Sequence, residues 1–496
     1  MSAQPILVLG QRGGPNPFSG YLREILASEG LAAWEYRDLA EAPTDLAGWR
    51  LILLENAPLP EVCRARVEEW VRDGGRLIAS RPPPEMAALF GLRPTKSAVK
   101  TCAEMYVAFD PAHPLASRIG ADSLQFHGVA DLYEPAGAEG VAWLGGQRGV
   151  RTGYPAVTLH AAGKGQAAAF AFDLALCTVL FHQGRRLNAG DGPNPDPNAD
   201  GAFKPDDLFF RFFDERLKSV PQADLYGDLL VRLIRRLCPA PLPRLWHYPN
   251  AAPSVAFLDG DSDSMSAEDF EKVISTVETA GGRFTIYLMP QQYAAIAPER
   301  MAALRTRGHD AGPHPFAGRT PTEADCARAV AQETTDFRAR YGFQPLAHRG
   351  HNVIWPGWVT HARELLRNGI RLDANFCCGP GLQYGYLNGS GLPVRFMDET
   401  GEIIEVYEQA TVSMEDGWYT EKTLMPAMTV AECAALSLRQ IDDAVDRWHA
   451  VYHPCFHPVY VRPGPKDSTP WIRAVACPLP CAAAWQRLCS HGCPPS

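Results

Sequence analysis

The first hundred residues alternate short apolar runs with amphipathic segments. The apolar runs predict buried strands, and apolar residues three or four positions apart predict helices that end near glycines. The expected strands are Ile6–Gly10, Trp49–Leu54 and Arg76–Ser80, and the expected helices are Tyr21–Glu29 and Pro60–Arg72. Strands that alternate with helices of roughly 10–15 residues indicate a doubly wound α/β sheet, mostly parallel.

After residue 140 the pattern shifts toward β structure and then to a long polar stretch. Strands are expected at Gly140–Leu144, Tyr154–His160 and Gly165–Asp173, and helices at Leu208–Leu217 and Leu225–Leu237. Residues 184–207 are rich in Pro, Asn, Asp and Gly without periodicity, which predicts a long loop.

Prolines at residues 239–243 predict a stiff boundary between two domains. We therefore expect an α/β domain over residues 1–240, a second domain over 245–475 and a tail over 476–496. The tail carries four of the thirteen cysteines, with x₃ gaps that do not match the usual short zinc knuckles. We expect it to be poorly ordered rather than a zinc site.

The composition is typical of a soluble globular protein, with 46% hydrophobic and 21% charged residues. A formal net charge of −9 argues against general nucleic-acid binding, which normally requires a basic surface. The chain contains no run of about eighteen apolar residues, and its first residues lack the pattern of a signal peptide. We expect a cytoplasmic protein without membrane or nucleic-acid partners.

The strongest chemical signal is a strand that ends in carboxylates. The apolar run Ser254–Leu258 leads into Asp259, Asp261 and Asp263 at alternate positions. A helical segment and a second apolar strand follow, and then Gly308–His314 supplies two histidines. Ligands and catalytic groups lie at the carboxyl ends of strands in α/β folds, and Asp with His can hold a divalent metal. A purely structural alternative is a turn that caps the next helix.

That alternative rests on Ser266 and Asp269. Ser266 is suited to be the N-cap and Asp269 stands three positions later, as in a capping box. It accounts for these two residues without requiring Asp259 or Asp261.

Roughly residues 250–465 resemble the polysaccharide deacetylase family, in the order of its motifs. The resemblance implies a distorted β/α barrel in which a metal-bound water attacks an acetamido carbonyl. In this family an Asp acts as base, a His acts as acid, and one Asp and two His hold the metal. The resemblance implies that Asp259 is the base and Asp261 the metal ligand. Two other registers stay open, with Asp259 or Asp263 as the ligand.

The same resemblance places His314 as the first histidine ligand. The family has a second histidine four positions later, where this chain has Gly318. His351 in Leu346–His351 is a plausible replacement, and Arg349 matches the arginine that orients the base. Near the end, His457 matches the acid, with His453 in reserve. Aromatic residues including Trp355 and Trp358 are candidates for a sugar-stacking wall, although such clusters are more often core.

The first half resembles the class I glutamine-amidotransferase-like fold in its non-catalytic, flavodoxin-like relatives. The resemblance rests on the opening strand and glycine loop, on the unit Glu68–Ser80 and on Gly163–Asp173. Members with activity need a cysteine in Gly-x-Cys-x-Gly, whereas Cys63 lies within an expected helix, so no such activity is expected. The loop Gly10–Gly14 is expected to be a plain turn rather than a phosphate cradle.

Together these features predict a metal-dependent hydrolase of non-peptide C–N bonds, with Zn²⁺ as the expected cofactor. A small acetamido sugar or related amide is the expected substrate. The alternative is an inactive deacetylase-like protein that binds carbohydrate without turnover. Gly318 favours the alternative, and the retained Asp, His and Arg residues favour the enzyme.

Overall fold

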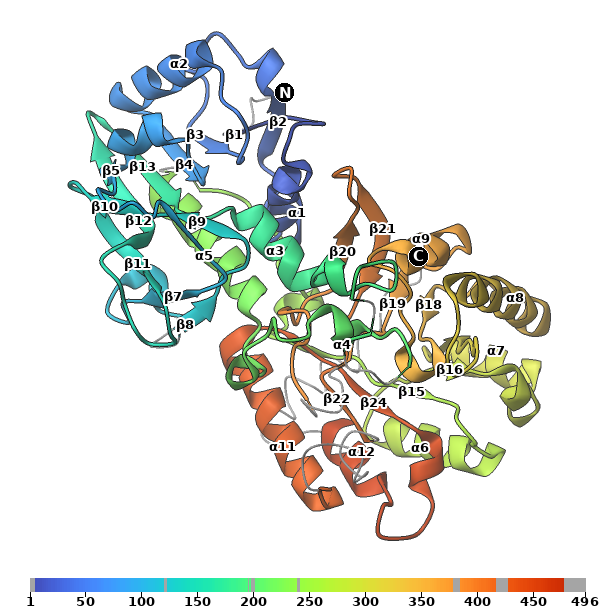
Figure 1. Ribbon diagram of the computed structural model, residues 1–496. Helices are drawn as coiled ribbons and strands as arrows, with labels where there is room; N and C mark the ends of the chain where they lie inside the picture. The colour runs from blue at the N-terminus through green and yellow to red at the C-terminus, as the bar shows by residue number, and fades with distance from the viewer. Residues whose placement is uncertain are drawn as a thin grey trace. The chain divides into compact units, whose positions relative to one another are not determined.

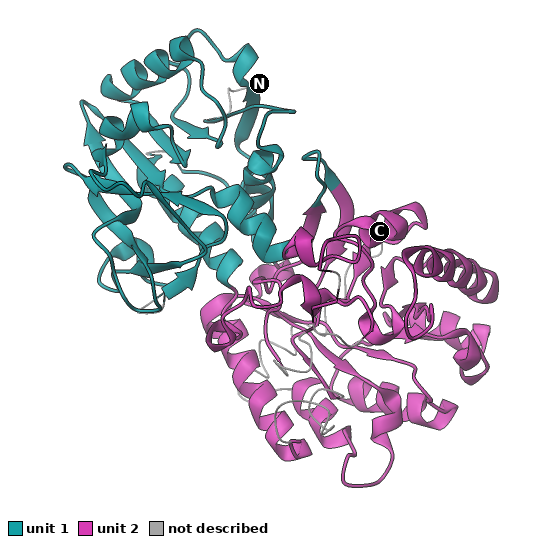
Figure 2. Ribbon diagram, in the orientation of Figure 1, with its two compact units in different colours: residues 1–182, 222–247, 397–403 teal, residues 183–221, 248–396, 404–496 magenta. Residues whose placement is uncertain are grey.

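The computed structural model describes residues 5–119, 123–194, 196–197, 201–238, 241–377, 384–415 and 427–476. The chain forms two compact units (Figure 2). Unit 1 comprises residues 1–182, 222–247 and 397–403, and unit 2 comprises residues 183–221, 248–396 and 404–496. The expected tail over 476–496 falls almost entirely outside the described residues.

Unit 1 is built on a nine-stranded sheet in the order β2-β1-β3-β4-β13-β12-β11-β7-β8 (Figure 1). The first five strands are parallel and the remaining pairs are antiparallel. The strands are β1 (Ile6–Gly10), β2 (Trp34–Asp38), β3 (Leu51–Leu54), β4 (Arg76–Ser80), β7 (Tyr106–Phe109), β8 (Ser123–Gln125), β11 (Glu139–Gly145), β12 (Pro155–Ala162) and β13 (Gly165–Phe170). Two small ribbons pair β5 (Leu92–Pro94) with β10 (Tyr133–Pro135) and β6 (Thr101–Ala103) with β9 (Val129–Asp131).

The expected doubly wound sheet is therefore present in the first half, with an antiparallel extension. Its helices are α1 (Tyr21–Ser28), α2 (Glu61–Arg72), α3 (Leu174–Gln183) and α5 (Gln222–Leu237). Every residue of β1 and β3 is buried, as apolar runs without alternation predict for strands covered on both faces. The amidotransferase likeness of this unit stays a prediction.

The helix expected over Leu208–Leu217 is wrong. The structure has a short helix α4 (Pro205–Leu208) and, separately, a 3₁₀ turn at Glu215–Leu217. Between them Arg211 has a φ of 52°, a left-handed conformation that interrupts an α-helix.

Unit 2 contains two main sheets of mostly parallel strands. The first has the order β17-β16-β15-β24-β22, all parallel, and the second the order β18-β19-β21-β20. The strands are β14 (Val255–Ala256), β15 (Asp259–Asp261), β16 (Thr285–Leu288), β17 (Asp310–Pro313), β18 (Ala347–His348), β19 (Leu372–Asp373), β20 (Val394–Met397), β21 (Ile403–Glu408), β22 (Ser413–Met414), β23 (Val451–Tyr452) and β24 (Pro454–Phe456). Strands β14 and β23 form a separate parallel pair.

The two sheets approach each other at both ends without forming one hydrogen-bonded barrel among the described residues. A Cβ on Gly312 in β17 would lie 2.1 Å from the carbonyl oxygen of Ala347 in β18. At the other end, His453 before β24 lies 3.1 Å from the carbonyl oxygens of Gln409 and Ala410, which follow β21. This arrangement is an interrupted ring of parallel strands and agrees with the general α/β class expected for the second half.

Helices lie around the outside of these strands (Figure 1). They are α6 (Ala267–Thr279), α7 (Pro298–Thr306), α8 (Glu323–Tyr341), α9 (Thr360–Arg367), α11 (Val430–Asp443) and α12 (Thr469–Ala476). Ser266 and Asp269 form the expected capping box of α6, with Ser266 Oγ accepting from the Asp269 amide at 3.2 Å. The cap uses neither Asp259 nor Asp261, so these two carboxylates require another explanation.

The segment over residues 183–221 belongs to unit 2, although it was expected in the first domain. Its backbone hydrogen bonds explain the difference. The amide of Trp355 donates to the carbonyl of Phe203 at 2.8 Å, and that of Tyr386 donates to the carbonyl of Lys218 at 2.8 Å. Sequence periodicity does not reveal such long-range pairing.

None of the helices in the described part of the chain is both long and apolar enough to span a membrane. A cytoplasmic location stays a prediction.

Candidate functional site

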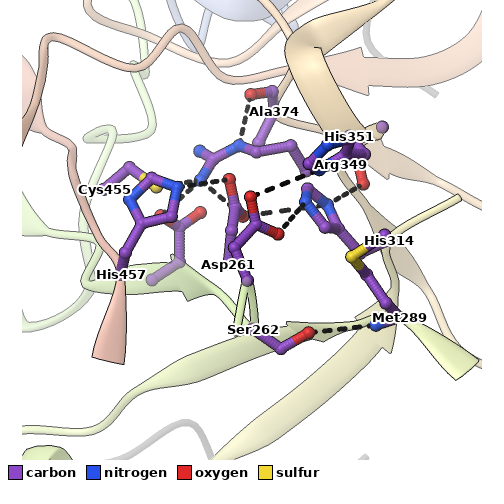
Figure 3. A network of polar contacts seen from close by, with 12 residues as sticks. Asp261, Ser262, Met289, His314, Arg349, His351, Ala374, Cys455 and His457 are labelled. Carbon is purple, nitrogen blue, oxygen red and sulfur yellow. Dashed lines mark hydrogen bonds and ion pairs between the residues drawn. The ribbon is translucent and has the colours of Figure 1, made fainter. Parts of the chain in front are cut away.

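The candidate site lies where several parallel strands of unit 2 end (Figure 3). Asp259 and Asp261 begin and end β15, and His457 directly follows its neighbour β24. His314 directly follows β17, and Arg349 directly follows β18. The carboxyl ends of parallel strands meet at one edge, so residues nearly two hundred positions apart come together there.

A glycine makes the close approach of β15 and β24 possible. A Cβ on Gly260 would lie 1.9 Å from the carbonyl oxygen of Phe456. Because a side chain at this position would collide with β24, glycine is needed for β15 to pair with β24 on one side while it pairs with β16 on the other.

Asp263, His314 and His351 form a group that could hold a metal ion. One ligand atom from each lies within 4.8 Å of the others. His314 Nε2 is 3.3 Å from Asp263 Oδ1, and His351 Nδ1 is 3.3 Å from Asp263 Oδ2. Asp263 Oδ1 and His351 Nδ1 are buried atoms without a hydrogen-bond partner among the described residues. One carboxylate and two imidazoles are a donor set that suits Zn²⁺, and the residues therefore fit the metal.

The orientation of His314 favours this interpretation. Its Nδ1 lies 2.8 Å from the carbonyl oxygen of Arg349, so Nδ1 carries the proton and donates it. Nε2 then faces Asp263 and is the nitrogen available to a metal. Metal-binding histidines usually donate their second ring nitrogen to an oxygen in this way.

His351 sits at the start of a strained turn. Asn352 and Val353 have φ values of 59° and 50°, which residues other than glycine rarely adopt. For the β-branched Val353 this conformation is an outlier, and such strain often accompanies functional sites. The turn leaves the His351 side chain 21% exposed, beside the 29% exposed side chain of Asp263.

Asp261 and His457 lie next to the three-residue group. His457 Nε2 is 3.8 Å from Asp261 Oδ2, and Asp261 Oδ1 is 3.9 Å from His314 Nδ1. The other ring nitrogen of His457 is 3.3 Å from Glu415 Oε2, and the His457 amide donates to Glu415 Oε1 at 3.0 Å. Glu415 therefore fixes the ring and directs Nε2 toward Asp261.

Arg349 connects Asp259 and Asp261. This fully buried side chain donates from Nη1 to Asp259 Oδ1 at 3.0 Å and to Asp261 Oδ1 at 3.4 Å. Nη1 also lies 2.6 Å from Cys455 Sγ, and Nη2 donates to Thr411 Oγ1 at 2.6 Å. A buried guanidinium with this many partners is held in one orientation.

Asp259 is the innermost of the three aspartates. Its side chain is fully buried, and Oδ2 lies 2.8 Å from His453 Nε2. Burial would raise the pKa of Asp259, but the charges of Arg349 and His453 outweigh it and hold the pKa below 3.8. Burial also opposes ionisation of Asp263, but the neighbouring His314 and His351 lower the pKa of this carboxyl.

The sequence placed Asp259, Asp261, His314, Arg349, His351 and His457 at one site, and the structure brings all six together. The positions within the site differ from the expected register. Asp263, rather than Asp261, faces the two ligand histidines, and Asp261 takes the place between Arg349 and His457 where Asp259 was expected. Asp259 instead contacts His453 and Arg349, away from the histidine ligands.

Other candidates take structural positions. Gly318 has a φ of 108° with open space around it, so the chain turns at the place of the missing histidine. His309 accepts from the Phe284 amide and contacts Glu278 outside the site. Trp355 and Trp358 are 1% and 3% exposed, which makes them core residues rather than a sugar-stacking wall.

Sequence reasoning missed Glu415, Thr411 and Cys455. Cys455 stands between the two acid candidates His453 and His457 but was not itself considered, whereas Glu415 and Thr411 lie outside the motifs. Nothing in the spacing of Glu415 and Thr411 signals contact with His457 or Arg349.

No family model and no curated protein matches the chain. Among solved structures, the carbohydrate deacetylase Agd3 is 10% identical over 95% of this chain and 83% of its own, with a TM-score of 0.37. A putative polysaccharide deacetylase from Mycobacterium smegmatis is 13% identical over 48% of this chain and 89% of its own, with a TM-score of 0.37.

A β-galactosidase from Bacillus circulans sp. alkalophilus is 14% identical over 35% of this chain, with a TM-score of 0.27. The chain spans only 29% of that enzyme's length.

Proposed function

We propose that the chain is a metal-dependent deacetylase that hydrolyses the acetamido group of a sugar or a related small amide. The observation that carries this proposal is the convergence of Asp263, His314 and His351 directly beside Asp261 and His457. Three of these groups suit a metal, and the other two suit proton transfer on either side of an amide.

In this proposal Asp263, His314 and His351 hold the metal, with Zn²⁺ as the best match to the donor set. A divalent ion bound there would polarise the amide carbonyl and lower the pKa of water. Asp261 replaces Asp259 as the proposed base, because it is the carboxylate that lies between His314 and His457. Arg349 orients it.

The proton transfers follow from the side chains. Water attacks the carbonyl carbon while Asp261 accepts one of its protons. His457 Nε2 then donates a proton to the nitrogen as the C–N bond breaks, and acetate and a free amine leave. Glu415 accepts from His457 Nδ1, which keeps the proton for donation on Nε2.

The direct test is acetate release from a panel of N-acetylated sugars and small amides, before and after chelation and with Zn²⁺ restored. Turnover that falls on chelation and returns with Zn²⁺ is expected, and His314→Ala should abolish it. His113→Gln, at a histidine of unit 1, is a control that should behave like the unmodified protein. Saccharide binding without acetate release would instead support the inactive carbohydrate-binding alternative.

A further inference from the structure

Three ionisable residues form a row at the ends of three adjacent strands, next to the segments that carry Arg349 and His351. His348, Asp373 and Glu408 are the last residues of β18, β19 and β21. The register pairs His348 with Asp373 and Asp373 with Glu408. All three side chains are fully buried. We call His348, Asp373 and Glu408 the strand-end row.

Direct contacts connect the row. His348 Nδ1 lies 2.7 Å from Asp373 Oδ1, and the Asn375 amide donates to Asp373 Oδ2 at 3.2 Å. Glu408 Oε1 accepts from the amide of Phe376 at 3.0 Å. Glu408 and Asp373 also share a side-chain hydrogen bond, which requires a proton on one of the two carboxyl groups. Two carboxyl groups side by side in a buried site cannot both be ionised without a large cost.

The segments that directly follow the strands of the row hold Arg349 and the backbone next to His351. Arg349 directly follows His348, and its Nε donates to the carbonyl of Ala374, which directly follows Asp373. Its Nη2 donates to Thr411, three residues after Glu408. Asn375 Oδ1 accepts from the Gly350 amide at 2.7 Å, next to His351. The support of Arg349 therefore comes from the segments that leave the strands of the row.

We propose that the strand-end row is a positioning device, in which a carboxyl proton on Glu408 and the His348–Asp373 hydrogen bond hold three strand ends in register and thereby fix Arg349. Because its three side chains are fully buried, the row acts through Arg349. The role in positioning Asp261 through Arg349 rests on the proposed function, whereas the role in holding the strands does not.

The charges around Glu408 support this assignment. Asp373 on β19 and Arg349 after β18 face it, and His348 and His361 face Asp373. Burial first, and then the charge of Asp373, raise the pKa of Glu408 well above its ordinary 4.5. Burial opposes ionisation of Asp373 as well, but the hydrogen bond from His348 lowers the pKa of that group.

The stability that Glu408 contributes to the fold falls as the pH rises. A raised folded-state pKa stabilises the fold fully below about 4.5, and the contribution is lost as the pH rises toward the folded-state value. Glutamine at position 408 resembles the protonated carboxyl and does not ionise. The ratio of wild-type to Glu408→Gln opening constants should therefore rise with pH, by up to about tenfold per unit above 4.5.

The test is amide hydrogen exchange of the full chain, followed in peptides that cover residues 346–352, 371–377 and 403–411 between pH 5 and 8. Glu408→Gln should match wild type at the low end and exchange more slowly at the high end. Glu408→Ala should exchange at least about tenfold faster than Glu408→Gln at every pH. Glu405→Gln, on the exposed face of β21, is the matched control and should follow wild type.

A wild-type to Glu408→Gln ratio that does not change with pH would overturn the proposal, even if Glu408→Ala fails to fold. Steady-state kinetics adds the positioning readout. Glu408→Ala should lower kcat about tenfold or more with little change in KM, and Glu408→Gln should restore kcat. A kcat that stays at the wild-type value in Glu408→Ala would remove the positioning role. If wild type shows no turnover, the proposed function fails, and the exchange data still decide whether the row holds the strands.

Discussion

His314 Nδ1 donates to the carbonyl oxygen of Arg349 at 2.8 Å. This bond links the residue that follows β17 to the residue that follows β18, and it fixes which nitrogen of His314 is free. The free nitrogen, Nε2, faces Asp263, 3.3 Å away. The bond therefore separates Asp263 from Asp261, which lies nearer to Nδ1 and cannot share a metal through that nitrogen.

Asp261→Asn should abolish most of the turnover without removing the metal. The amide cannot accept the proton of the attacking water, and general bases typically contribute about 10²–10⁴-fold. Acetate release and metal content of the same preparation measure both effects. Loss of the metal together with activity would mean that Asp261 is a ligand.

His457 and Glu415 should act as a pair. His457→Gln removes the proton donor and should lower kcat by about 10²–10⁴-fold. Glu415→Gln leaves the donor but weakens its orientation, so a smaller loss is expected. The double variant should be no slower than His457→Gln alone, and additive losses would contradict the pairing.

The pair of Asp259 and Arg349 should matter for stability. Asp259→Asn leaves a fully buried guanidinium with less compensation, and breaking a buried ion pair typically costs about 3–5 kcal/mol. Urea unfolding followed by a probe in unit 2 measures the loss. Glu271→Gln breaks the exposed pair with Arg300 and should cost about 1 kcal/mol or less. Equal losses in the free energy of unfolding would show that the buried pair stabilises the fold no more than the exposed pair.

Convergence of strand ends in a parallel fold predicted a site at the Asp259–Asp263 and Gly308–His314 stretches, and the resemblance to the polysaccharide deacetylase family added Arg349, His351 and His457. The sequence could not decide among Asp259, Asp261 and Asp263, because alternate residues of an extended strand point to the same side. What distinguishes them is burial, because Asp259 is fully buried whereas the side chain of Asp263 is 29% exposed. Which aspartate meets His314 and His351 depends on how the connecting segments fold, and the periodicity of the sequence carries no information on that.

The fold of the first half was easier to predict, because apolar runs and glycine-terminated helices mark β1, β3, β4 and α2 directly. The segment over residues 183–221 was harder. Its attachment to unit 2 depends on backbone bonds to residues far along the chain, such as Trp355 and Tyr386.

Glu55 gives unit 1 a pH-dependent stability. Burial first, opposed by the charge of Arg23, raises the pKa of Glu55 from 4.5 to about 7. Because the folded-state pKa is the higher one, the stabilisation is present below 4.5 and lost as the pH rises through 7. Glu55→Gln should therefore stabilise unit 1 at pH 8 by about 3 kcal/mol relative to wild type, and by little at pH 4.5.

Urea unfolding at the two pH values, with a probe in unit 1, measures this difference. Glu35→Gln, at a half-buried neighbour on β2, is the control and should show no comparable change between the two pH values. An equal effect of Glu55→Gln at both would contradict a raised pKa.

The most direct test of the metal site is anomalous X-ray scattering at the zinc edge from crystals of the full chain grown with Zn²⁺. One strong peak is expected about 2.0–2.2 Å from Asp263, His314 Nε2 and His351 Nδ1, and no peak in Asp263→Ala. A peak ligated by Asp261 instead of Asp263, or a site that stays empty with Zn²⁺ in excess, would contradict it.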